Sequence, residues 1–114
     1  MANVNDLYKA SFGQYGSAFD DAAGSAITPD TGMIICAITF LDDTGLAGLV
    51  AEDDVNGGNE SFGLTPGHTG AGAGGVVIDA SNIFPKGMTI FGRWTSVTTT
   101  ANSAAGIIVY FSPK

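Results

Sequence analysis

The stretch of residues 88–112 constrains the fold of this chain more than any other part of the sequence. Its first run, residues 88–99, consists mostly of β-branched and aromatic residues, which are enriched in strands. Its second run, residues 106–111, is a continuous apolar segment that is too short for a helix. Between them, residues 101–104 supply turn chemistry through Asn102. We therefore expect two strands that lie next to each other in one antiparallel sheet.

The composition extends this expectation to the whole domain. A chain of 114 residues is long enough for one domain with a modest core. Its 17 glycines and 4 prolines indicate many turns, and 45% hydrophobic against 13% charged residues is the wrong balance for a disordered chain. The sequence predicts an all-β fold, a small antiparallel β-sandwich of jelly-roll type that comprises residues 22–114.

The charge of the chain argues against two classes of partner. At a net charge of −7 it lacks the basic face that nucleic acid or an anionic membrane requires. Residues 1–7 have neither the basic start nor the apolar core of an export signal, and the apolar run 33–38 is too short to span a membrane. We expect synthesis in a reducing cytoplasm, with the single cysteine, Cys36, as a buried apolar residue.

Residues 1–21 are predicted to form an extended N-terminal arm. Phe12, Tyr15 and Phe19 are separated by glycine and serine, and their spacing fits neither the helical nor the strand period. Aromatic residues on such a segment suggest an arm that lies on another surface, and an irregular first strand of the same domain is the alternative.

The middle of the chain predicts three further elements. Residues 33–41 are apolar on both faces, as in a central strand, and a turn leads into residues 46–51, which we expect to return as the second strand of a hairpin. The long Gly-rich loop of residues 52–75 contains little that can be buried and is expected to be exposed and mobile. A short strand is expected at residues 76–78.

No motif for catalysis, a metal or a cofactor fits its required context. Residues 70–75 match G-x-G-x-x-G as a string, but a dinucleotide site needs a strand before it and a helix after it. The acidic residues around Glu52 do not follow the EF-hand pattern, and a solvated acidic loop is the simpler interpretation. His68 is the only histidine, with no activated serine near it in sequence. We expect a non-enzymatic protein without a metal or cofactor.

Arg93 and Trp94 are adjacent, and on a strand their side chains point to opposite faces. Trp94 is expected in the core with Ile90, and Arg93 on the other face with Phe91. Two roles remain open for Arg93: an ion pair with Asp79 or Glu52, or an anchor in a protein interface, where arginine is enriched. The candidate residues for an interface between copies of the chain are Arg93, Ile108 and Tyr110.

Three segments of the chain resemble a known family. They are LVAED at residues 49–53, IDASNIFPKGMTIFGRWTSV at residues 78–97 and GIIVYF at residues 106–111. Their order and spacing are similar to those of small virion structural proteins of tailed bacteriophages, which are usually head decoration (cement) proteins.

This resemblance implies an all-β homo-oligomer, commonly a trimer, that binds the major capsid protein. It also implies assembly in the host cytoplasm and a final place on the capsid surface. Phe12, Tyr15 and Phe19 would then be the candidate attachment residues. Two alternatives remain: a tail or fibre module that binds a host glycan, and a non-viral β-sandwich binding protein.

Overall fold

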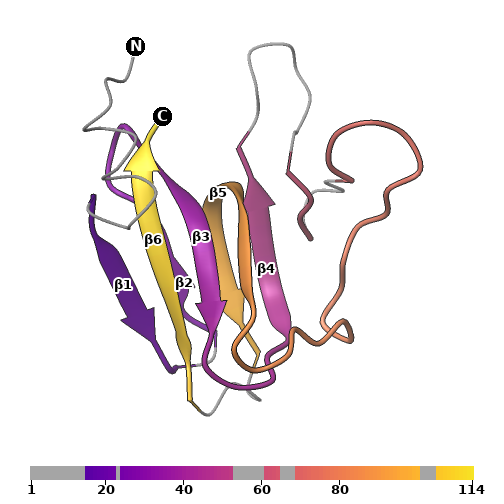
Figure 1. The fold of residues 1–114 in the computed structure, drawn as a ribbon, viewed down its shortest axis with the longest axis horizontal. Coiled ribbons are helices and arrows are strands. Elements are labelled where there is room, and N and C mark those ends of the chain that lie inside the picture. The colour runs from indigo at the N-terminus through magenta and orange to yellow at the C-terminus, as the bar shows by residue number, and fades with distance from the viewer. Residues whose placement is uncertain (1–14, 23, 53–60, 65–68, 101–104) are drawn as a thin grey trace.

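The computed structural model describes residues 15–22, 24–52, 61–64, 69–100 and 105–114, and these residues form an all-β domain without a helix (Figure 1). The strands are β1 (Ser17–Asp20), β2 (Ala26–Ile27), β3 (Met33–Phe40), β4 (Leu46–Ala51), β5 (Thr89–Thr99) and β6 (Ile107–Pro113). All strand pairs are antiparallel. The predicted fold class is therefore confirmed: the sheet is curled until it is nearly closed like a barrel, consistent with a small β-sandwich domain.

β3 is the central strand of the sheet, as its sequence predicts. The strand order is β1-β6-β3-β5-β2, and β4 pairs separately with β5. Two expectations about neighbours are wrong. β3 and β4 do not form a hairpin, because β4 pairs with β5. β5 and β6 are in the same sheet but not adjacent, because β3 lies between them. A turn signal shows where the chain reverses, whereas the choice of neighbour depends on which apolar faces pack best.

β5 is long enough to pair with three other strands. Its first half pairs with β3, and its second half pairs with β4 and β2. Between Val50 and Ala51 of β4 the register shifts, so that Thr95 is an extra residue in β5. Such a bulge changes which residues face inward. Trp94 and Val97, three residues apart, are therefore both fully buried.

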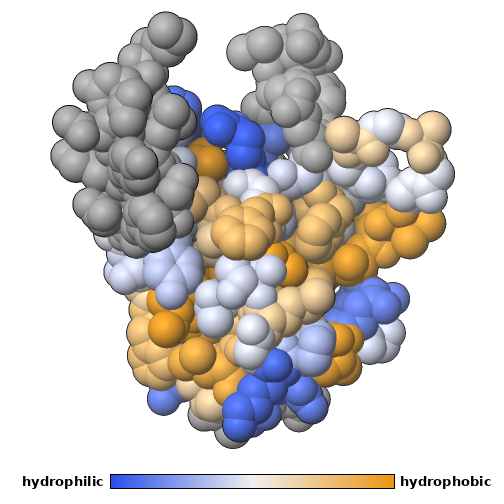
Figure 2. All heavy atoms as spheres, viewed as in Figure 1, coloured by the Kyte–Doolittle hydropathy of each residue, from blue (hydrophilic) through white to orange (hydrophobic). Residues whose placement is uncertain are grey.

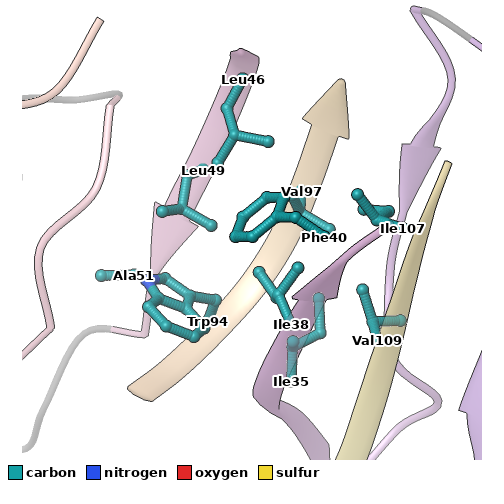
Figure 3. Packing of buried hydrophobic residues seen from close by; sticks show 10 residues of the cluster. All are labelled: Ile35, Ile38, Phe40, Leu46, Leu49, Ala51, Trp94, Val97, Ile107 and Val109. Carbon is teal, nitrogen blue, oxygen red and sulfur yellow. The ribbon is translucent and has the colours of Figure 1, made fainter. Parts of the chain in front are cut away.

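The core lies on the concave side of this curled sheet (Figure 3). β3, β4, β5 and β6 all contribute side chains to it. Its ten buried residues are Ile35, Ile38, Phe40, Leu46, Leu49, Ala51, Trp94, Val97, Ile107 and Val109. Trp94 is its largest member, which confirms the prediction that this side chain is buried, and Ile90 packs against the cluster beside it.

Two phenylalanines outside the strands complete the core. Phe84 stacks on Phe40 with ring centroids 4.8 Å apart, and Phe62 meets Trp94 edge-on at 5.8 Å. The indole Nε1 of Trp94 donates a hydrogen bond to the carbonyl oxygen of Phe62 at 2.7 Å. The expectation that residues 52–75 have little to bury is therefore wrong for residues 61–64, since Phe62 and Leu64 pack against the core.

The ends of the predicted elements also need correction. Residues 76–78 form no strand despite their β propensity, because no strand among the described residues pairs with them. Residues 17–20, assigned to the arm, pair with β6, so the alternative of a first strand holds for them. Phe12 and His68 lie outside the described residues. Among the residues that the structure describes, no helix is long and apolar enough to cross a membrane.

Candidate protein interface

The face of the sheet opposite the core carries two rows of paired residues. Strand pairing places directly opposed residues on the same face. In one row, Phe19 of β1 pairs with Ile108 of β6, which pairs with Thr39 of β3, which pairs with Thr89 of β5. In the other row, Ser17, Tyr110, Ala37 and Phe91 follow in the same order of strands. We call this surface, made by these eight residues, the outer face.

Aromatic side chains stand out from the outer face. Phe91 is 76% exposed and Phe19 is 58% exposed, while Ile108 and Tyr110 between them are half-buried. Figure 2 shows hydrophobic and near-neutral residues over the middle of the side of the molecule that carries β3 and β6 toward the viewer. Aromatic residues are enriched in protein interfaces, so their exposure on this face is typical of a protein contact.

Polar contacts within the outer face are satisfied by neighbours. The hydroxyl groups of Thr39 and Thr89 are 2.8 Å apart and share a hydrogen bond. Cys36, an extra residue where β3 bulges against β6, is half-buried, and its Sγ donates to the carbonyl oxygen of Tyr110 at 3.4 Å. Burial raises the pKa of the Cys36 thiol, which therefore stays protonated near neutral pH.

Arg93 extends the outer face beyond Phe91. A Cβ at Gly92 would meet the Trp94 ring, so Gly92 and Trp94 share the core side, and the alternation along β5 places Phe91 and Arg93 on the outer side. The Nε of Arg93 lies 2.8 Å from Oε1 of Glu52. Of the two partners predicted for an ion pair, Glu52 is thus the one observed.

The ion pair leaves part of the arginine available for other partners. The Arg93 side chain is 44% exposed. Within the described part of the chain, its two Nη atoms have no hydrogen-bond partner. The backbone of Arg93 is held on both sides, because its N–H donates to Ser61 Oγ at 2.9 Å and its carbonyl accepts from the N–H of Glu52 at 2.9 Å. A fixed backbone with an accessible guanidinium is suited to bind a carboxylate of a partner.

The structure brings together residues that the sequence assigned to separate roles. Phe19, a candidate for capsid attachment, lies directly beside Ile108 and near Tyr110, both candidates for self-association. Tyr15 is half-buried in the turn before β1 and is not among the exposed residues. Phe91, the most exposed aromatic residue of the outer face, was not among the predicted site residues. The sequence did contain a signal for it, because alternation along a strand places Phe91 on the face opposite Trp94.

The described residues contain no group of three or more His, Cys, Asp or Glu side chains placed to hold a metal ion. Comparisons with protein-family models, with curated proteins and with solved structures found no match to this chain.

Proposed function

We propose that this chain is a head decoration (cement) protein of the tailed-bacteriophage type. In this proposal it is a non-enzymatic homotrimer that is made in the host cytoplasm and binds the major capsid protein on the outside of the head, without a metal or cofactor. The resemblance of residues 49–53, 78–97 and 106–111 to such proteins supports the family, and the outer face supports the mode of binding.

The observation that carries the proposal is the pair of exposed aromatic residues on a rigid sheet. Phe19 and Phe91 lie on the two outermost strands of the row β1-β6-β3-β5, and the half-buried Ile108 and Tyr110 lie between them. Aromatic residues and arginine dominate the binding energy of many interfaces. Because the strands fix the backbone, binding has to order only the side chains and not the chain.

The acidic character of the chain fits this mode of binding. A net charge of −7 keeps the protein soluble and favours a partner surface that is basic or neutral. The outer face itself carries no carboxylate in its two rows, since these consist of Phe, Ile, Thr, Ser, Tyr and Ala. The apolar contact can therefore form without burying an unpaired charge.

The proposal is tested by binding of purified protein to heads that lack it. Phe91→Ala and Phe19→Ala each remove an exposed ring, and we expect each to weaken binding by about tenfold or more, the loss typical of an interface anchor. Ile83→Ala is the matched control, because Ile83 is also an exposed large hydrophobic residue but lies in the segment that connects β4 to β5 and not on the outer face. It is expected to bind as wild type.

Two results would overturn the proposal. One is that wild-type protein does not bind heads at any stage of maturation. The other is that it binds a host surface glycan instead, which identifies the tail or fibre alternative. A variant that lacks residues 1–14 then separates the two candidate attachment surfaces, since it removes Phe12 and keeps the whole outer face.

A further inference from the structure

The curled sheet has two different ends. At one end lies β1, which pairs with β6 only. At the other end, beyond β4, the N–H of Leu64 donates to the carbonyl of Leu49 at 2.8 Å, and the N–H of Ile78 donates to the carbonyl of Gly63 at 3.2 Å. Single hydrogen bonds therefore continue the sheet from β4 through residues 61–64 to Ile78. Figure 1 shows β1 and the segment of residues 69–82 on opposite sides of the domain.

Gly75 lies against the backbone of Thr69, and Val76 and Val77, which lead from it into Ile78, have the character of a strand without a paired neighbour among the described residues. Val76 is 78% exposed and Val77 is 40% exposed. In the part of the chain that the structure describes, the backbone groups of Val76 and Val77 make no hydrogen bond. Consecutive β-branched residues favour the extended conformation of a paired strand. Val76 and Val77 are exposed, so another strand could pair with them.

The free edge of β1 is the complementary feature. β1 uses one edge for β6, and no residue that the structure describes pairs with its other edge. Residues 75–77 are Gly, Val and Val and carry no charge, and the one carboxylate of β1 is Asp20 at the end of the strand. Two copies of an acidic chain can approach at these segments without placing carboxylates against each other.

We infer that residues 75–77 of one copy add to the free edge of β1 of a second copy and so continue the sheet between subunits. The donor and the acceptor are different segments on opposite sides of the domain (Figure 1). A contact between them is head-to-tail and generates a closed ring when the rotation between neighbours allows it. This arrangement rests on the self-association in the proposed function and not on capsid binding. It leaves the part of the outer face around Phe91, on β5, available for the capsid.

The side chains also fit this pairing. A strand added beside β1 places a β-branched residue next to Phe19 and extends the row formed by Phe19, Ile108 and Thr39. Pairs of an aromatic and a β-branched residue across strands are favourable contacts. The exposed ring of Phe19 would then be partly covered by a valine of the neighbouring copy.

Cross-linking tests the pairing directly. In a Cys36→Ala background, Ser17→Cys and Val76→Cys are combined in one chain, and the protein is oxidised at micromolar concentration. Because β1 and the segment of residues 69–82 lie on opposite sides of the domain (Figure 1), a disulfide between the two positions joins two molecules, and we expect closed trimers on a non-reducing gel. Ser17→Cys combined with Ala47→Cys is the control, since Ala47 is exposed on β4, and it is expected to remain uncross-linked.

A second variant, Val76→Pro, removes a backbone N–H that has no partner within the described chain. We expect its thermal unfolding to match that of wild type and its self-association to weaken about tenfold or more in light scattering. Unchanged oligomers in Val76→Pro together with absent cross-links would overturn the pairing and leave self-association intact. A monomeric wild-type protein that still binds heads would overturn the pairing and leave the decoration function intact.

Discussion

Gly92 and Trp94 are in direct contact across one face of β5. A Cβ at Gly92 would lie 2.6 Å from Cζ2 and 2.7 Å from Cη2 of the Trp94 indole, and 2.9 Å from Ser61 Oγ. No side chain fits there unless the indole moves. Since the indole Nε1 also donates to the carbonyl of Phe62, the position of this ring fixes the segment of residues 61–64 against the core.

Gly92→Ala is therefore expected to destabilise the domain. The added methyl group overpacks the site, and we expect a loss of about 1–3 kcal/mol in the free energy of unfolding, measured by urea denaturation. Gly48→Ala is the matched control in the neighbouring strand β4. Its Cβ would lie 3.3 Å from Thr98 Oγ1, a tight contact that a small shift relieves, so we expect a change within about 0.5 kcal/mol of wild type. Equal losses in the two variants would show that the indole does not restrict Gly92.

Phe62→Ala and Phe91→Ala separate stability from surface function. Phe62 contacts the rings of Trp94 and Phe84, so its removal is expected to cost about 1.5–3 kcal/mol of unfolding free energy. Phe91 is 76% exposed, and its removal is expected to change stability by no more than about 0.5 kcal/mol. Calorimetry of both variants checks this difference. A large loss of stability in Phe91→Ala would mean that its ring supports the fold and is not available to a partner.

The ion pair between Arg93 and Glu52 is expected to contribute little to stability. The arginine side chain is 44% exposed, and water screens such pairs. A double-mutant cycle with Arg93→Met and Glu52→Gln should give a coupling free energy of about 0.2–1 kcal/mol that decreases with added salt. A coupling of several kcal/mol, unchanged in high salt, would contradict the assignment of Arg93 to partner binding and give it a structural role.

The lowered pKa of Asp79 gives a prediction for how stability changes with pH. The Ser81 hydroxyl, then the Ser81 backbone N–H, donate to its carboxylate and hold the pKa of Asp79 below its usual value. A lowered pKa in the folded state stabilises the fold above the unfolded pKa of Asp79, and this stabilisation is lost as pH falls through the folded pKa. Ser81→Ala is expected to raise the pKa of Asp79 in an NMR titration of its carboxyl carbon. Ser25→Ala, at another exposed serine, is expected to leave it unchanged.

The four longest strands and most of the core were predictable from local patterns, because burial determines the residue type at each position; β1 and the short β2 were not. Residues 33–41 predicted the central strand β3, and the alternation around Trp94 predicted which face of β5 is buried. The two predictions of neighbouring strands were wrong because periodicity shows which face of a strand is apolar but not which strand pairs with its edge. From the sequence alone, β4 and β6 are equally suitable neighbours of β3.

The candidate interface was predictable only in part. Phe19, Ile108, Tyr110 and Arg93 were each identified, but their place on one face depends on the register between β1, β6, β3 and β5. The contribution of Phe62 to the core was not predictable, because it lies in a Gly-rich segment whose contacts are all with residues distant in sequence. Residues 76–78 show the opposite case, a strand pattern without a partner in the chain.

The most direct test of the proposed function is the number of copies of this chain in a virion, measured by quantitative mass spectrometry of purified particles of the encoding phage. A decoration protein covers the head, so we predict a copy number comparable with that of the major capsid protein, with loss of the chain when the outer face carries Phe91→Ala together with Phe19→Ala. A chain that is absent from virions, or present in only the few copies of a tail component, would contradict the account.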